Sequence, residues 1–326
     1  MESNKQNPSL EADMKSLVEV LSASVRRHPA DGLLLSGGLD TSVLAALASQ
    51  RRKPYCLTVA LKGAPAPDIE YAKKIAETFN LRHEIIYFGE QELENSLRAT
   101  IQILGSFDPM EVRNSTACYI GLKAAKDRGL ASVMTGDGGD ELLAGYSFFF
   151  DLKREQLSAE LSKMWANMSF SSIPLGHDLG IAVALPFLDT EFIAFAKRLD
   201  PALLVNIRNG KPYGKWILRK AFESTLSPEV VWRVKAPLEV GTGTTTLPSY
   251  YDSGIANSEF AEKKARFLAE DRVKLRSKEH LHYYEIYRST RGIPHLKSVS
   301  GRSCPECGSN VKENFSYCRV CGAYPI

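Results

Sequence analysis

The sequence predicts an α/β fold in which a parallel sheet carries helices on both faces, followed by a mostly helical second half. Three observations predict it. Short apolar segments alternate with helical segments over the first 150 residues. Glycine-rich turns follow two of the predicted strands, and strand-like segments disappear after residue 150.

The first half alternates its elements in a regular order. Apolar residues at helical spacing predict helices over 10–28, 41–50, 68–80, 91–104 and 114–128. Short apolar runs predict strands over 33–35, 55–61, 83–87 and 131–134. Ligands of such sheets bind beyond the carboxyl ends of the strands, so the turns after residues 35 and 134 are expected at the site.

The second half reads as helices and loops. We expect Asp189 to cap a helix that begins at Thr190, because its carboxylate can accept from free N–H groups there. Residues 211–222 and 257–289 are predicted to be helical, and residues 240–249 to be a loop.

The predicted domain organisation has two parts. Residues 1–291 form one domain, with an α/β core over about 10–150 and a helical part over 151–291. A linker over 292–303 then leads to a small module over 304–326.

Composition predicts a folded protein, since 41 basic residues are balanced by 38 acidic ones and 44% of residues are hydrophobic. Residues 261–326 hold 13 Lys/Arg and 7 Asp/Glu, whereas the preceding residues hold 28 and 31. This basic end is either a solvated face or a contact for nucleic acid or an acidic partner. No apolar run approaches the ~18 residues of a membrane span, and no secretory signal is visible, so we expect a soluble cytoplasmic protein.

The stretch SGGLDTS, residues 36–42, is the first candidate site. Glycines let backbone N–H groups approach a ligand closely, and a helix start favours phosphate. Asp40 would repel phosphate unless Mg²⁺ lay between them. The alternative is a tight turn in which Asp40 is only a helix cap.

This stretch resembles the pyrophosphate-binding PP-loop, SGGxDS, of ATP pyrophosphatases. Five further segments resemble asparagine synthetases in family order: residues 64–85, RNSTACYI (113–120), TGDGGDELLAGY (135–146), GIAVALPFLD (180–189) and WRVKAPLEVGTG (232–243). The chain is therefore identified as similar to the synthetase part of this family, over roughly two-thirds of its length.

The resemblance implies an enzyme, a carbon–nitrogen ligase that converts ATP to AMP and pyrophosphate. A carboxylate is activated as an acyl-adenylate and attacked by ammonia, most simply converting aspartate to asparagine. The residues implied to bind ATP and its pyrophosphate are Leu35, Ser36, Gly37, Gly38, Asp40, Thr41, Ser42, Leu61 and Gly136.

The resemblance also implies catalytic and metal-binding residues. Asp40 and Asp140 would hold Mg²⁺, Lys235 would stabilise the transition state at the α-phosphate, and Asp137 would take a proton from ammonia. Arg113 would steer an anionic acid. The structural alternatives are turn residues for the aspartates, a surface lysine for Lys235 and an ion-pair partner for Arg113.

Three departures from the family are visible. Glu2 stands where glutamine-using members have a catalytic cysteine, so we expect free ammonia or a separate ammonia-supplying partner. Ala182 and Ala184 stand where members often have Glu and Arg before PFLD, so the acid substrate is not identified. The third departure is the C-terminal module.

That module carries Cys304, Cys307, Cys318 and Cys321 in a CxxC-x10-CxxC pattern, which predicts a zinc ribbon with structural Zn²⁺ rather than two disulfides. The two other cysteines, Cys56 and Cys118, read as small buried hydrophobes. The ribbon either contacts tRNA or a protein or packs on the synthetase part; the residues in question are Lys312, Phe315, Tyr317 and Arg319.

Two other functions are kept as hypotheses. One is a PP-loop enzyme that adenylates a tRNA base, with the ribbon contacting RNA. The other is a non-enzymatic adaptor built on a degenerate synthetase. What argues against the adaptor is that the motif residues are intact: Asp40, Asp137, Asp140 and Lys235.

Overall fold

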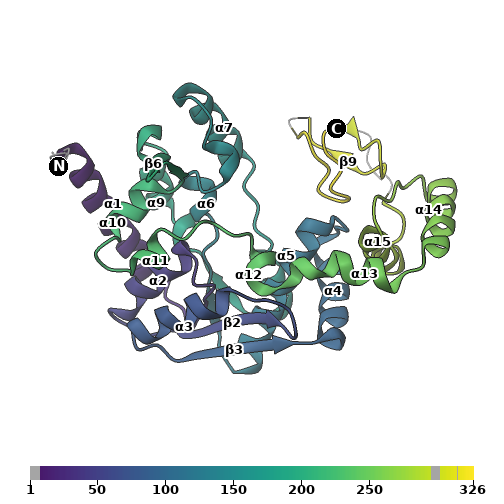
Figure 1. Ribbon diagram of the computed structural model, residues 1–326, viewed down its shortest axis with the longest axis horizontal. Helices are drawn as coiled ribbons and strands as arrows, with labels where there is room; N and C mark the ends of the chain where they lie inside the picture. Colours follow the sequence, from purple (N-terminus) through teal and green to yellow (C-terminus); the bar gives the residue numbers. More distant parts are fainter. Residues whose placement is uncertain (1–7, 295–301, 314) are drawn as a thin grey trace.

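The computed structural model describes residues 8–294, 302–313 and 315–326 (Figure 1). Its centre is a five-stranded parallel sheet in the order β3-β2-β1-β4-β5. The strands are β1 (Gly32–Leu34), β2 (Tyr55–Leu61), β3 (His83–Phe88), β4 (Ser132–Met134) and β5 (Ala182–Ala184). The predicted class, a parallel α/β sheet with a mostly helical second half, is confirmed.

Apolar side chains alternate between the two faces of the sheet, so each face has its own core. Leu33 and Leu35 belong to the core that includes α1 (Pro8–Arg27), α2 (Leu39–Ser49) and α3 (Asp68–Thr78). Leu34 packs against the core of the other face, which includes α5 (Pro109–Asp127) and α8 (Ser172–Leu179). Helix α4 (Glu90–Leu104) packs against α5.

The strand order reverses direction at β1. The chain runs outward from β1 through β2 to β3, and then returns so that β4 pairs with the other side of β1. The connections that leave β1 and β4 therefore separate at their carboxyl ends. Such a switch point is where open α/β sheets bind their ligands, and both glycine-rich turns lie there.

The second half is mostly helical, as predicted. Its α-helices are α6 (Gly139–Leu142), α7 (Arg154–Ala166), α9 (Thr190–Ala196), α10 (Trp216–Ala221), α11 (Pro228–Val231), α12 (Leu238–Thr242), α13 (Leu247–Gly254), α14 (Asn257–Asp271) and α15 (Lys278–Arg291). Short 3-10 turns lie at η1 (Ser147–Phe149), η2 (Pro186–Leu188), η3 (Pro201–Leu203) and η4 (Thr244–Thr246).

Several predictions for this half are wrong. Residues 182–184 form the edge strand β5, and β6 (Asn206–Arg208) pairs with β7 (Lys211–Tyr213) as a hairpin. The predicted helix over 211–222 therefore begins only at Trp216. The predicted loop over 240–249 contains the end of α12, the turn η4 and the start of α13. These short elements are stabilised by tertiary packing, which local periodicity does not reveal.

The predicted cap of α9 is confirmed. Oδ1 of Asp189 accepts from the backbone N–H of Glu191 at 3.0 Å and of Phe192 at 3.4 Å. The same carboxylate pairs with the guanidinium of Arg27, at 2.6 Å from Nη2 to Oδ1, and with His28. Asp189 thus joins α1 to the segment that follows β5.

The C-terminal module lies against α4, α5 and α15 (Figure 1). It contains the two-stranded sheet β8 (Arg302–Ser303) and β9 (Asn310–Val311) and shares a hydrophobic cluster with Phe107 and Tyr284. Residues 295–301 of the predicted linker lie outside the described residues. In the described part of the chain, no helix is long and apolar enough to cross a membrane.

Candidate active site

The loop between β1 and α2 is shaped by its glycines. Gly37 has a φ of 66°, and a Cβ there would lie 2.4 Å from the Cβ of Tyr71. Oγ of Ser36 accepts from the N–H of Gly38 at 3.2 Å and lies 3.1 Å from Oγ1 of Thr41. The first N–H groups of α2 follow, and such groups bind anions.

The second loop, residues 135–146, packs directly on the first. A Cβ at Gly136 would lie 3.1 Å from the Cβ of Asp40, and one at Gly139 would lie 2.8 Å from its Cγ. Gly138 has a φ of 93° and packs on Leu188. Glycine is therefore required where the second loop passes the carboxylate of the first.

Two aspartates and two lysines meet between these loops. Nζ of Lys215 bonds to the carboxylate of Asp40 and lies 2.7 Å from Oδ1 of Asp140, and Nζ of Lys235 pairs with Oδ2 of Asp140. The side chains of Lys215, Asp40 and Asp140 are 6%, 14% and 16% exposed. The four groups form a charge-balanced cluster in which Lys235, with its side chain 32% exposed, is the least buried.

Burial and pairing act differently on the two carboxylates. Burial raises the pKa of Asp40, and the attraction of Lys215 does not fully offset it. Burial also acts to raise the pKa of Asp140, but the ammonium groups of Lys215 and Lys235 outweigh it and lower that pKa. Oδ1 of Asp40 has no hydrogen-bond partner among the described residues. A buried carboxylate oxygen that has no hydrogen-bond partner among the described residues is a suitable ligand for a divalent cation.

Lys215 was missed in the sequence analysis, which assigned it to the interior of a helix. It instead precedes α10 with a φ of 54°, and its backbone N–H donates to the carbonyl of Leu143 at 2.9 Å. Gly214 permits this approach, since a Cβ there would lie 2.0 Å from the carbonyl oxygen of Ala144. The sequence Gly214-Lys215-Trp216 offered one signal, a glycine directly before the lysine. A glycine alone does not indicate which residues Lys215 contacts.

The segment that carries Lys235 is held by two arginines. Arg219 is buried and donates to the carbonyls of Gly214 and Val231, and to that of Arg233 at 3.2 Å. Arg233 pairs with Asp68 at 2.7 Å and lies over the ring of Tyr71, 4.0 Å from its centroid. These contacts fix the backbone next to Lys235.

Asp137 lies on the same loop as Asp140 and lines the same cavity. Burial raises the pKa of its carboxyl group, and a hydrogen bond from Oγ of Ser172 only partly offsets the rise. A carboxyl group with a raised pKa holds a proton more readily than an ordinary one, as a proton acceptor must.

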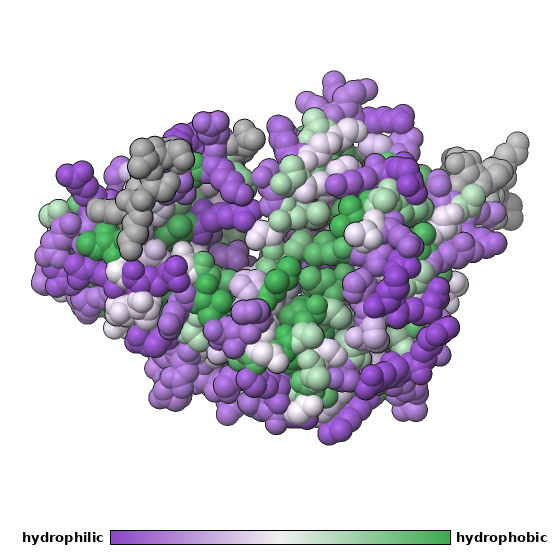
Figure 2. Space-filling model, turned by 180° about the vertical axis from the view of Figure 1, so that it is seen from behind, coloured by the Kyte–Doolittle hydropathy of each residue, from purple (hydrophilic) through white to green (hydrophobic). Residues whose placement is uncertain are grey.

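A cavity of about 600 Å³ opens between the loops, α5 and the segment around Lys235. Seen from behind, apolar residues gather around a hollow in the middle of the molecule (Figure 2). The predicted residues that line the cavity are Leu35, Ser36, Gly38, Asp40, Thr41, Gly136, Asp137, Asp140 and Lys235. Leu34, Leu57, Val59, Met110, Ala117 and Cys118 supply much of its apolar wall.

Four predicted residues are not part of that lining in the described structure. Gly37 supports the loop, and Ser42 is buried on the first turn of α2. Leu61 is the last residue of β2 and packs against the cluster around Phe107. Arg113 is bound between two carboxylates, at 2.8 Å from Glu239 and 2.6 Å from Glu279. The geometry of Arg113 matches its structural alternative.

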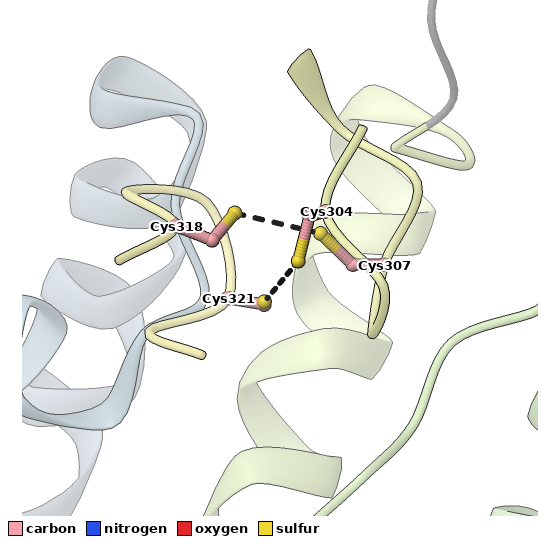
Figure 3. Close-up of side chains that lie close together, drawn as sticks. All are labelled: Cys304, Cys307, Cys318 and Cys321. Carbon is pink, nitrogen blue, oxygen red and sulfur yellow. Dashed lines mark hydrogen bonds between the residues drawn. The ribbon is translucent and has the colours of Figure 1, made fainter. Parts of the chain in front are cut away.

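The four C-terminal cysteines converge on one point (Figure 3). Their Sγ atoms lie within 4.8 Å of one another, with 3.7 Å between Cys304 and Cys321 and 3.7 Å between Cys307 and Cys318. Thiolates at ~2.3 Å from a tetrahedral zinc ion lie ~3.8 Å apart, so the four cysteines fit Zn²⁺. These spacings also exclude disulfides.

Two of the other residues discussed for this module contact the preceding part of the chain, as in the alternative in which the ribbon packs on the synthetase part. Phe315 is buried in the cluster shared with Phe107, and Arg319 lies over its ring and donates to the carbonyl of Asn167 at 2.8 Å. Tyr317 is 38% exposed. Cys56 is buried as predicted, whereas Cys118 is half-buried and lines the cavity.

A parallel sheet with a glycine-rich loop and a carboxylate–lysine cluster at its switch point defines a nucleotide-binding α/β protein. The model of the family described as "Asparagine synthase" matches residues 16–178 and 175–291. The chain therefore belongs to the asparagine synthase family, as the resemblance indicated.

Individual relatives agree with this assignment. The chain is 30% identical to a probable glutamine-hydrolyzing asparagine synthetase of Schizosaccharomyces pombe, over 78% of this chain and 52% of that protein. It is 28% identical to asparagine synthetase B of Escherichia coli, over 91% and 57%. The chain thus spans about half the length of these relatives. An NMN synthetase structure from Francisella tularensis aligns with a TM-score of 0.39 at 16% identity, over 87% and 94%.

Proposed function

We propose that the chain is an ATP-dependent carbon–nitrogen ligase. A carboxylate attacks the α-phosphorus of ATP and releases pyrophosphate, and ammonia then displaces AMP from the acyl-adenylate to give an amide. The observation that carries this proposal is the cluster of Asp40, Asp140, Lys215 and Lys235 where the two glycine-rich loops meet. Family membership supports the same reaction class.

The loop after β1 is assigned to the pyrophosphate part of ATP. The hydroxyl groups of Ser36 and Thr41 and the first N–H groups of α2 would donate to phosphate oxygens. Asp40 and Asp140 would hold Mg²⁺, which when bound neutralises charge on the leaving pyrophosphate. The donor set suits this ion, because Mg²⁺ prefers oxygen ligands and Oδ1 of Asp40 is buried with no hydrogen-bond partner among the described residues.

Lys235 and Asp137 are assigned to the two chemical steps. Lys235 is partly exposed in the cavity and would place positive charge beside the α-phosphate as charge develops there. Asp137 would accept a proton from the attacking ammonia, and its raised pKa supports that role.

Aspartate and ammonia are the first substrates to test, because the relatives are asparagine synthetases. The basic side chains that line the cavity are Lys215, Arg219, Arg233 and Lys235, and all four are already paired with a carboxylate or bonded to backbone. The assay therefore needs other acids beside aspartate. Free ammonia or a separate partner would supply the nitrogen.

We also propose that residues 304–326 bind one structural Zn²⁺, since four thiolates leave no open coordination position. The division of the chain after residue 291 is part of this proposal. It is supported by the family match, which ends at residue 291.

The proposed reaction is tested by pyrophosphate release from ATP–Mg²⁺ with purified protein, with and without an acid and ammonium. Lys235→Ala is expected to abolish acid-dependent release with little loss of stability, while the exposed control Lys211→Ala retains it. Release by Lys235→Ala at the parental rate would remove the role assigned to Lys235. Release that requires tRNA instead of a small acid would favour the tRNA-modifying alternative.

A further inference from the structure

The C-terminal module is docked on the α4–α5 connection through its second CxxC turn, here called the second knuckle (Cys318–Gly322). The N–H of Phe107 donates to the carbonyl of Val320 at 2.7 Å, and Oγ of Ser106 donates to the carbonyl of Arg319 at 2.8 Å. Both contacts use backbone carbonyls that the CxxC turn itself holds in place. Figure 3 shows this turn beside the connection.

The contact continues into the start of α5. Gly322 has a φ of 71°, and a Cβ there would lie 2.3 Å from Oδ1 of Asp108. Asp108 is the N-cap of α5 and accepts from the N–H of Met110 at 3.2 Å. The second knuckle therefore packs on the residue that begins α5.

The same helix forms one wall of the ATP cavity. Met110, Asn114, Ala117 and Cys118 lie on its first three turns and line the cavity. Oδ1 of Asn114 also accepts from the N–H of Glu239 at 3.1 Å, which ties this wall to α12. An unbroken series of contacts thus runs from the second knuckle through Asp108 to the cavity.

The first knuckle (Cys304–Gly308) contacts a different part of the chain. The N–H of Lys274 donates to the carbonyl of Glu306 at 2.8 Å, and Arg276 pairs with Glu306 at 2.6 Å. These residues lie between α14 and α15. Arg276 also donates to the carbonyl of Cys321, so the two knuckles share this neighbour. The contacts with Ser106, Phe107 and Asp108 described above are made by the second knuckle.

We propose that the second knuckle is a positioning element for the ATP cavity: by holding Phe107 and Asp108 it fixes the wall that α5 contributes. The inference rests on the proposed function in that ATP is the ligand of this cavity. The second knuckle does not contact the reacting groups. Loss of its contact with α5 is therefore expected to weaken ligand binding more than it slows turnover.

Gly322→Ala tests this proposal, with Gly308→Ala as the matched control. Each glycine follows a CxxC pair, with φ of 71° and 72°, and donates to the first cysteine of its knuckle, at 2.8 Å and 2.9 Å. The two substitutions thus impose similar backbone strain, and the Cβ at 322 would in addition lie against Asp108. Zinc content by mass spectrometry is expected at about one ion per chain in both variants.

Two readouts then decide the proposal. Gly322→Ala is expected to speed hydrogen exchange over residues 106–118 and to weaken ATP–Mg²⁺ binding about tenfold by calorimetry, an ordinary size for coupling between sites. Gly308→Ala is expected to leave both unchanged. Equal effects of the two variants, or unchanged exchange in zinc-loaded Gly322→Ala, would overturn the proposal.

A second variant covers the case in which Gly322→Ala does not fold. Ser106→Ala removes the hydroxyl contacts with the second knuckle, together with the bond that this hydroxyl accepts from the N–H of Asp108 at 3.2 Å, and leaves every cysteine and glycine in place. It is expected to change exchange and affinity in the same direction. If the parent protein binds no ATP, the proposed function has failed, and the exchange measurement still decides whether the second knuckle holds α5.

Discussion

Lys215 places its ammonium group between the carboxylates of Asp40 and Asp140 and so joins the two glycine-rich loops through one buried cation. Burial acts to lower the pKa of Lys215, but the two carboxylates outweigh it and raise that pKa. The lysine is therefore held charged, and its removal would leave two buried carboxylates without their main partner.

Lys215→Met is expected to lower the free energy of unfolding by about 3 kcal/mol, because breaking a buried ion pair leaves uncompensated charge. Mg²⁺ is expected to restore part of this loss in the variant, since it can bind the carboxylates that Lys215 vacates. Thermal unfolding with and without Mg²⁺ measures both effects. Lys220→Met is the control, because Lys220 pairs with Glu223 while one-third exposed. A parental response to Mg²⁺ in Lys215→Met would contradict the expectation.

Gly145→Ala is expected to destabilise the protein by about 3 kcal/mol or more and to abolish ATP binding. The added Cβ would lie 1.9 Å from Oδ1 of Asp140 and 2.4 Å from Cε of Lys215. Gly254→Ala is the control, since nothing lies within 4 Å of a Cβ at that position. Chemical denaturation and calorimetry give the two quantities, and parental ATP affinity in Gly145→Ala would show that the cluster is not needed for binding.

Asp189 is expected to make stability depend on pH on the acid side. The hydrogen bond from Arg27 is the main cause that lowers the pKa of Asp189 below its usual range. Its contribution is therefore complete above the ordinary carboxyl pKa of ~4 and is lost as pH falls through the lower folded-state pKa. Asp189→Asn is expected to flatten this part of the curve of unfolding free energy against pH.

Urea unfolding between pH 2 and pH 7 measures that curve. Asp200→Asn is a suitable control, because Asp200 caps a short turn and pairs with the exposed Arg154. An acid limb of equal steepness in Asp189→Asn and in the parent would contradict the expectation.

Arg113→Met separates the two roles considered for Arg113. Its pairing with Glu239 and Glu279 predicts a loss of about 3 kcal/mol in unfolding free energy, with the KM for the acid nearly unchanged. Arg98→Met, at an exposed position of α4, is the control. A raised KM for the acid at parental stability would instead support the role of Arg113 in steering the substrate.

The strands of the first half could be predicted because each is a short apolar run between helices with clear periodicity. β2 was predicted at its observed bounds, and β1, β3 and β4 within one residue at each end. The edge strand β5 was missed, since three residues of alanine and valine carry no alternating pattern. Its pairing with β4 comes from the fold rather than from local preference.

The carboxylates of the site could be predicted because they belong to motifs, but their main partner could not. Lys215 is 175 residues away from Asp40 in the sequence, and no spacing rule connects them. Arg219 and Arg233 were missed for the same reason, as their partners are backbone carbonyls and Asp68. Long-range pairing of this kind becomes visible only when the sheet order is known.

The order of the site's elements along the chain also determines when the site can form in a protein that is synthesised from its N-terminus. Both glycine-rich loops and their aspartates leave the ribosome well before Lys215 and Lys235, and the second knuckle follows both lysines. A growing chain therefore contains Asp40 and Asp140 before the two lysines that balance their charge have been made. Nucleotide binding would become available only after Lys215 and Lys235 have been made and have packed against the two loops.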